Sequence, residues 1–319
     1  MDQHTSSSPV TSQKCYNTRI ISSHTNMINR TVLAIGINIP AEEKIAIQKK
    51  LKLKDIILDI ASIKDIIFTI IDGEIEVEIK DFDLKKYDYI WIQSGWNTTH
   101  MAYLLHLYLK SKNIPHNKTN SHNTKLSDIF SLASKNILVP NTFFHNGLKV
   151  NNENIQDIEK ICKFPCIYKT SLGSLGSHVY LIEKKSDIEQ TIKKNGKYNR
   201  YIFQTFIPNT FDYRVVISNG KSESVCKRTR IKDKFRNNVA LGASEDFIDV
   251  KNVSSEILEL AIQSAKALNL NWAGVDVVTD TNTGKNYVLE VNRRPGLTVK
   301  SSEISAACKY INDLVNITL

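Results

Sequence analysis

The chain has 319 residues, 41% of them hydrophobic and 24% charged, the balance of a globular protein with one large or two smaller domains. No apolar run is long enough to span a membrane and the first thirty residues lack a signal-peptide core, so we expect a cytoplasmic protein without membrane partners. The five cysteines are scattered, which argues against a disulfide framework or a zinc site. The net charge of +9 is spread along the chain, which favours an ordinary charged surface, then an acidic substrate, over nucleic-acid binding.

The first third of the chain predicts a tail followed by a small α/β domain. Residues 1–30 are rich in Ser, Thr, Asn and His and read as a disordered tail. After them, apolar and alternating runs predict strands, and apolar residues at helical spacing predict helices. The predicted strands are 31–37, 56–60, 66–71, 74–79 and 87–93, and the predicted helices are 41–51 and 99–112. Strands that alternate with helices indicate an α/β domain over 31–118.

The remainder, 119–319, reads as a new unit that mixes helices and strands. The predicted helices are 124–135, 155–162, 187–194, 253–268 and 302–315. The predicted strands are 166–170, 178–182, 201–207, 212–218, 222–230, 273–278 and 287–291. Asn219-Gly220 predicts a tight hairpin turn between two of these strands. The chain as a whole is therefore predicted to be α/β in the broad, α+β sense.

A glycine- and serine-rich loop, 171–177, joins two predicted strands directly after Lys169. Backbone amides can surround a phosphate where no Cβ obstructs them, and a neighbouring lysine adds positive charge. The loop is not a Walker A motif, because its lysine precedes the glycines and no helix follows. Taken alone, an ordinary hairpin connection explains it as well as a phosphate site.

The predicted hairpin near the C-terminus concentrates oxygen ligands. Side chains alternate along a strand, so Glu290 and Asn292 leave the same face, and Asp276 on the preceding strand faces them if the two strands pair directly. Two carboxylates and an amide oxygen form a hard-ligand set that suits Mg²⁺ shared with a nucleotide phosphate. A hairpin with one solvated face is an equal alternative for this stretch alone.

The predicted strand 222–230 is unusually basic. Lys227, Arg228 and Arg230, followed by Arg236, place positive charge near the amide pair Asn237-Asn238. A solvated edge strand explains these charges equally well.

The order of these features resembles the ATP-grasp ligases, specifically the RimK-type branch. A-G-V-D on one strand, followed by L-E-V-N-x-x-P-G on the next, carries the resemblance, together with the preceding lysines, glycine loop, Asp-x-Arg and Arg-Asn-Asn. It covers roughly two thirds of the chain, from about residue 120 to the end, and is looser over 31–118. It implies an ATP-grasp fold in two subdomains, 119–204 and 205–319, behind a small pre-ATP-grasp α/β domain.

The resemblance also implies a role for each candidate site residue. Binding of ATP is implied for Lys125, Lys169, Gly173, Ser174, Gly176, Gln204, Thr205, Phe206, Ile207 and Asp212. Contact with the γ-phosphate, and hence a catalytic role, is implied for Arg228, Arg236 and Asn238. Binding of Mg²⁺, with Mn²⁺ as the alternative ion, is implied for Asp276, Glu290 and Asn292.

Two departures from the branch pattern concern the nucleotide hinge and the acceptor site. Thr205 follows Gln204 where the branch has Glu, and 240–243 read Ala-Leu-Gly-Ala where the branch has His-Arg-Gly-Gly. The second departure removes an arginine near the acceptor and weakens the expectation of an acidic substrate. One hypothesis is that Arg293 and Arg294 supply that charge from another direction.

The implied activity is an ADP-forming carboxylate–amine ligase that makes an amide bond through an acyl-phosphate. Two alternatives remain within the fold: a ligase that crosslinks acidic side chains of a precursor peptide, and a nucleotide-binding module that has lost ligase activity. The implied partners are small carboxylates and amines or an acidic peptide or protein. Nucleic-acid binding fits only the net charge, and self-association is left open.

Overall fold

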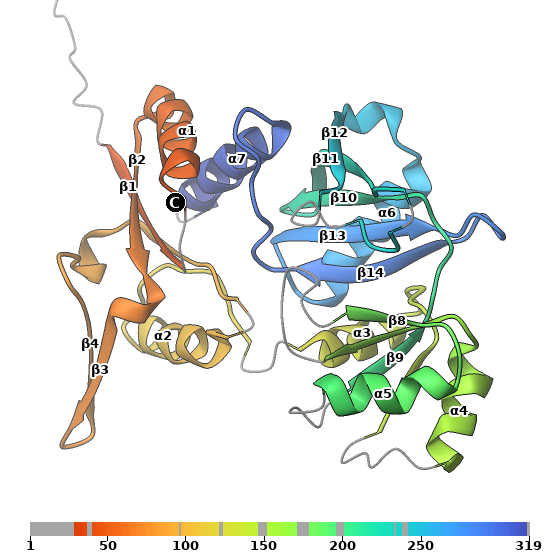
Figure 1. Ribbon diagram of the computed structural model, residues 1–319. Helices are drawn as coiled ribbons and strands as arrows, with labels where there is room; N and C mark the ends of the chain where they lie inside the picture. The colour runs from red at the N-terminus through yellow and green to blue at the C-terminus, as the bar shows by residue number, and fades with distance from the viewer. Residues whose placement is uncertain are drawn as a thin grey trace, which may run out of the picture.

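The computed structural model describes residues 29–36, 40–95, 97–120, 124–145, 152–170, 179–195, 201–232, 234–237 and 242–317. Figure 1 shows three sheets, each with its own helices, and one projecting hairpin. The predicted tail up to residue 28, the loop residues Gly173, Ser174 and Gly176, and Asn238 lie outside the described residues. The predicted mixture of helices and strands is confirmed.

The N-terminal sheet is parallel. Side chains alternate along its central strand, so they pack on one helix on each face of the sheet. Its strands lie in the order β2-β1-β5, with bounds Ile56–Ser62, Arg30–Gly36 and Tyr89–Ile92. Val32 and Ala34 pack on α1 (Ala41–Leu51), while Leu33 and Ile35 pack on the other side with α2 (Thr99–Ser111).

A separate antiparallel hairpin extends from this unit (Figure 1). It consists of β3 (Ile66–Ile71) and β4 (Glu74–Ile79). Ile66 and Ile79 at its base are buried in the α2 core, while Ile70 near its tip is 71% exposed. Short 3-10 turns lie at Lys52–Lys54, Ile63–Asp65, Leu84–Lys86 and Val250–Asn252.

The smaller antiparallel sheet has the strand order β6-β9-β7-β8. The bounds in that order are Thr142–Phe144, Tyr201–Thr205, Cys166–Thr170 and Val179–Ile182. Two helices, α4 (Asn152–Cys162) and α5 (Ser186–Asn195), pack on it through a core that includes the fully buried Tyr168 and Phe203.

The larger antiparallel sheet has the strand order β12-β11-β10-β13-β14. The bounds in that order are Ser244–Ile248, Lys221–Thr229, Phe211–Ser218, Trp272–Thr279 and Asn286–Asn292. One face packs on α6 (Ser255–Ala267) and on α3 (Lys125–Ala133) through Val215 and Val275. Asn219 and Gly220 both have positive φ in the turn between β10 and β11, as the predicted hairpin turn requires.

The last helix, α7 (Ser302–Ile317), joins the N-terminal sheet to the larger sheet (Figure 1). Tyr310 on α7 stacks on Trp272 of β13, with ring centroids 5.2 Å apart, and meets Trp91 of β5 edge-on at 5.4 Å. Three aromatic rings from three distant segments thus lie in one core, which holds the N-terminal unit against the larger sheet.

Most of the predicted elements are confirmed to within a few residues, but the pattern predicts neither β6 nor β12. β6 has only three residues, and β12 carries adjacent charged residues, so neither shows an alternating apolar pattern. Each is a strand because it pairs with a neighbour, β6 with β9 and β12 with β11. The four cysteines in the described residues are free and buried, as expected, and Cys15 lies outside those residues. No helix in the described part of the chain is long and apolar enough to cross a membrane.

Candidate nucleotide and metal site

The three predicted metal ligands lie on one face of the β13–β14 hairpin. Asp276 is directly opposite Glu290, so the predicted pairing is confirmed. An irregularity in the register next to Asp276 shifts the alternation of β14. Val288 and Val291, three residues apart, therefore both reach the α6 core, while Glu290 and Asn292 are directed to the opposite face.

Asp276 belongs to a network of two carboxylates and two guanidinium groups. Arg214 donates from Nε to Asp276 Oδ1 and from Nη2 to Oδ2, both at 2.9 Å. Arg228 makes the same two-pronged contact with Asp212 at 2.7 Å and also reaches Asp276 Oδ2 at 3.1 Å. The strand register produces this arrangement, because Asp212 is opposite Arg228 and Arg214 is opposite Asp276.

The two carboxyl groups of this network differ in their pKa. Burial raises the pKa of Asp212 to about 6 against the opposing effect of Arg228. Burial alone would also raise the pKa of Asp276, but Arg214 and Arg228 outweigh it and hold that pKa below its ordinary value. Asp276 therefore stays ionised, and the network balances its charges internally.

The basic strand β11 is not an edge strand, so that alternative is wrong. β11 lies between β10 and β12, and the side chain of Arg228 is only 4% exposed. The guanidinium group of Arg228 pairs with buried carboxylates instead of facing solvent. Arg214 is the group that the sequence did not single out; the Asp-x-Arg spacing, which places it on the same strand face as Asp212, was the available signal.

Two lysines approach Glu290, one from the helix α3 and one from the smaller sheet. Lys125 begins α3, whose N-terminus is capped by Thr124, and its Nζ lies 3.3 Å from Glu290 Oε1. Lys169 lies on β7 and is 8% exposed. Within the described residues the Lys169 ammonium forms no ion pair. Burial lowers its pKa to about 8, with Lys125 adding to the effect and Glu290 opposing it.

The donors on this face suit a hard cation that is also bound by phosphate. No group of three or more His, Cys, Asp or Glu in the described residues could hold a metal by itself. Asp276 keeps one unused lone-pair position, since its oxygens accept three of about four hydrogen bonds. The side chain of Glu290 is 38% exposed, and Asn292 Oδ1 is the amide oxygen on the same strand face. These oxygens fit Mg²⁺ if phosphate and water complete its shell.

The predicted nucleotide hinge begins with the last two residues of β9 and is held by polar contacts. Gln204 Nε2 donates to Thr142 Oγ1 at 2.8 Å, so its side chain is bound to β6. The Ile207 carbonyl accepts from Asn209 Nδ2 at 2.7 Å, and Asn209 Oδ1 accepts from Asn237 at 2.9 Å. Asn209 thus connects the hinge to the basic segment after β11, a link that no local pattern in the sequence indicates.

Three further candidate residues lie in the hinge and in the segment after β11. Phe206, within the hinge, is half-buried, and the buried Thr205 Oγ1 has no hydrogen-bond partner among the described residues. Arg236 lies over the ring of Phe235, 5.0 Å from its centroid.

The two arginines after β14 both have acidic neighbours. Arg293 makes a two-pronged contact with Asp128 of α3 at 2.7 and 2.8 Å. Burial raises the pKa of Glu43 on α1, and the charge of Arg294 opposes this rise. Their proposed role toward an acidic acceptor stays a prediction, and Arg293 would first have to leave Asp128.

Comparison with protein families decides which family this arrangement represents. A model of the RimK-like ATP-grasp domain matches residues 122–314, more than half of the chain. The chain belongs to the RimK-like ATP-grasp family. A relative named probable alpha-L-glutamate ligase, from Xanthomonas oryzae pv. oryzae (strain MAFF 311018), is 31% identical over 170 residues. That match covers 52% of this chain and 55% of the relative, so the chain spans about half the length of the curated relatives it matches.

Solved ATP-grasp structures share the fold across most of the chain. The ligase PsnB, in complex with a minimal precursor variant, Mg and ADP, has a TM-score of 0.66 at 14% identity over 90% of this chain and 99% of PsnB. D-alanine–D-alanine ligase from Bacillus anthracis has a TM-score of 0.62 at 16% identity, over 91% and 97% of the two chains. The predicted ATP-grasp fold is thereby confirmed.

Proposed function

We propose that this RimK-like ATP-grasp protein is an ADP-forming carboxylate–amine ligase. One observation carries the proposal: Lys125 and Lys169 meet Glu290 on the strand face that also carries Asp276 and Asn292. A buried lysine without an ion-pair partner among the described residues is costly unless an anion neutralises it. A nucleotide phosphate is the anion that this family's fold suggests.

The lysines and the hinge would bind ATP. Lys125 and Lys169 would contact its phosphates, and the segment with Gly173, Ser174 and Gly176 would cover them. The hinge residues Gln204, Thr205, Phe206 and Ile207 would face the adenine, with Asp212 at the nucleotide edge. Support comes from the position of Lys169 at the end of β7, directly before that segment.

The cations of the site would act on the transferring phosphoryl group. Mg²⁺, held by Asp276, Glu290 and Asn292, supplies charge neutralisation at the phosphates when bound. Arg228, Arg236 and Asn238 would face the γ-phosphate. Arg228 is rigidly held by Asp212 and Asp276, so its charge is oriented before the reaction begins. A carboxylate oxygen of the substrate would attack the γ-phosphorus and release ADP, which gives an acyl-phosphate. An amine would then attack the acyl carbon, release inorganic phosphate and lose a proton to give the amide.

The proposed reaction is specific, but the proposed substrates are defined only by class. A small carboxylate and amine, or an acidic peptide or protein, would satisfy the same site. Relatives support both kinds: some are named glutamate ligases, and solved neighbours such as PsnB and MdnC are described with precursor peptides.

Thermal stabilisation by ADP tests the proposal. The melting temperature of the full chain is measured with ADP, with and without Mg²⁺, for wild type, Glu290→Gln and the control Glu256→Gln, an exposed position on α6. We expect a Mg²⁺-dependent rise in wild type and control that Glu290→Gln loses. A wild type without any shift, or a shift that Glu290→Gln retains in full, contradicts the proposed site. A positive result is followed by a screen of acids and amines for ADP release.

A further inference from the structure

The projecting β3–β4 hairpin has a face that the proposed ligase site does not use. Residues directly opposite each other in a hairpin share a face, and the face with Ile66 and Ile79 packs into the α2 core. The other face combines uncharged side chains of β3 with glutamates of β4. In order of pairing, its members are Ile67 and Glu78, Thr69 and Glu76, and Ile71 and Glu74. We call this set the acidic face.

The acidic face is exposed and its charge is not compensated. Ile71 is 65% exposed, and Ile67 is also exposed. The three glutamates are exposed and form no ion pair within the described residues. They stand in a row with a spacing of about 7 Å along β4, so they repel one another, although the chain as a whole has a net charge of +9. A basic partner with apolar side chains would stabilise this face.

The outer side of α1 has the opposite charge. Exposed residues at i, i+4, i+7 and i+8 lie on one side of α1 and of the 3-10 turn that continues it: Ile45, Lys49, Lys52 and Leu53. We call this set the basic face. Leu53 is 86% exposed, and neither lysine forms an ion pair within the described residues. Glu42 lies one turn before Ile45 and marks the end of the basic face on that side.

The two faces match in length and in the kinds of side chain they carry. The acidic face extends about 14 Å from Glu74 to Glu78, at about 3.4 Å per strand residue. The basic face extends about 12 Å from Ile45 to Leu53, at about 1.5 Å per helix residue. Each face combines apolar side chains with charges of a single sign. Pairing the two faces would bury the apolar side chains and neutralise both sets of charges.

One chain cannot bring its own two faces together. Figure 1 shows α1 and the tip of the hairpin at opposite ends of the N-terminal unit. Two copies related by a two-fold axis would place the hairpin of each copy against α1 of the other. The same contact then forms twice, and the assembly closes as a dimer. A second copy of the chain is thus a partner that has the required charge and apolar side chains.

We propose that the acidic face of the hairpin binds the basic face of α1 on a second copy of this chain, in a two-fold symmetric dimer. Each copy contributes about ten residues to the two contacts, fewer than the roughly 20–30 per partner of a standard interface. The dimer is therefore expected to be weak, with a dissociation constant on the order of 10 μM.

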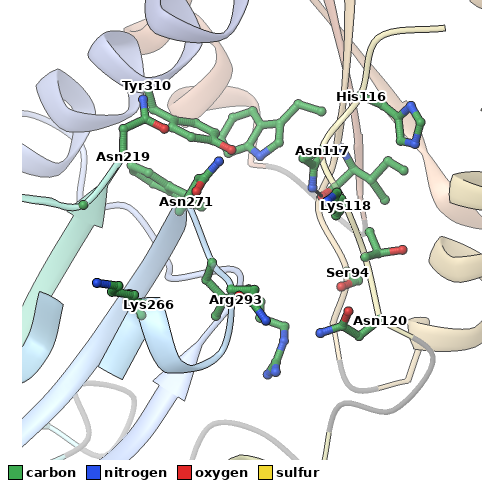
Figure 2. Close-up of a pocket in the computed structure, with 18 of the residues that line it drawn as sticks. Ser94, His116, Asn117, Lys118, Asn120, Asn219, Lys266, Asn271, Arg293 and Tyr310 are labelled. Carbon is green, nitrogen blue, oxygen red and sulfur yellow. Dashed lines mark hydrogen bonds between the residues drawn. The ribbon is translucent and has the colours of Figure 1, made fainter. Parts of the chain in front are cut away.

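The proposed contact leaves the cavity between the N-terminal unit and the larger sheet open. This cavity has a volume of about 980 Å³, and Figure 2 shows His116, Asn117 and Lys118 across from Asn219 and Arg293. Its described lining includes no residue of α1 or of the hairpin. Dimer formation therefore does not depend on the proposed ligase function.

Sedimentation equilibrium of the full chain at about 0.15 M salt tests the proposal. We expect wild type to approach twice the 36.2 kDa of one chain as its concentration rises. Reversing the charge of either face should weaken the dimer about tenfold or more, because each contact occurs twice. The two variants are Glu74→Lys/Glu76→Lys on the hairpin and Lys49→Glu/Lys52→Glu on α1. The second brings the net charge closer to zero, so a general charge effect would strengthen association instead.

Two further variants separate the contact from misfolding and from net charge. The variant with all four substitutions restores opposite charges across the contact and should dimerise within about threefold of wild type. The control is Glu153→Lys/Glu256→Lys, which makes the same charge change as the hairpin variant at exposed positions on α4 and α6. It should also stay within about threefold of wild type.

Three results would overturn the inference. The first is a wild type that stays monomeric up to about 200 μM. The second is an equal loss in the control and the hairpin variant, which indicates repulsion by net charge alone. The third is a fourfold variant that stays as weak as the two variants it combines.

Discussion

At the candidate site, the charge of the Asp–Arg network on the larger sheet is compensated, whereas the charge of Lys169 on the smaller sheet is not. Asp212, Asp276, Arg214 and Arg228 pair with one another through contacts of 2.7 to 3.1 Å. Lys169, on the opposing sheet, is as buried as they are but has no ion-pair partner in the described structure. The Asp–Arg network stabilises the fold and orients Arg228. The buried charge of Lys169 destabilises the folded state, and we expect a bound anion to offset this cost.

Arg228→Met should have the largest effect, on the free energy of unfolding. The substitution removes the guanidinium group that pairs with Asp212 and one of the two guanidinium groups that pair with Asp276. We therefore expect the free energy of unfolding to fall by about 3–5 kcal/mol. Urea denaturation measures it. Lys227→Met on the same strand is the control and should change stability by less than about 1 kcal/mol. A small effect of Arg228→Met would mean that the network contributes little to stability.

Glu290→Ala should lower turnover and leave the free energy of unfolding nearly unchanged. Its ion pair with Lys125 is partly exposed, so the free energy of unfolding should change by less than about 1 kcal/mol. Turnover, measured as ADP release with a productive acid and amine, should fall by about 10²–10³ because a ligand of the proposed metal is lost. Near-normal turnover would remove Glu290 from the metal site.

Lys169→Met should raise stability, the opposite sign to Arg228→Met. The pKa of Lys169 is lowered from 10.5 to about 8, so the buried charge disfavours the folded state at neutral pH. Removing it should stabilise the chain by about 2–3 kcal/mol and abolish stabilisation by ADP. Destabilisation by Lys169→Met would show that the ammonium already has a partner in the folded chain.

The pH dependence of nucleotide binding gives the smallest effect. At pH values below about 8 Lys169 is protonated in the folded chain; above that value it must take up a proton when phosphate binds. ADP affinity should therefore fall by up to about tenfold per pH unit between pH 8 and 10. Over the same window the stability of wild type should rise relative to Lys169→Met, since the unfolded chain holds the extra proton. Calorimetry across this range checks both trends, and Lys169→Arg should show neither.

The strand face with the proposed metal ligands was predictable because it depends on local geometry. Alternation along β14 and direct pairing across a short turn place Asp276, Glu290 and Asn292 together whatever the rest of the chain does. The approach of Lys125 and Lys169 followed only from the family resemblance, since these residues lie on different elements and no spacing rule connects them.

By itself, the sequence predicted the order of most helices and strands, the family resemblance, and the strand face that carries Asp276, Glu290 and Asn292, because these depend on periodicity and on residues close together in the chain. Only the tertiary structure decided that Arg228 lies buried between two carboxylates rather than on an edge, that Arg293 binds Asp128, and that α7 joins two sheets. It also formed the cavity between the N-terminal unit and the larger sheet. Each of these depends on contacts between segments far apart in sequence, whose partners are chosen by packing and by the cost of burying charge.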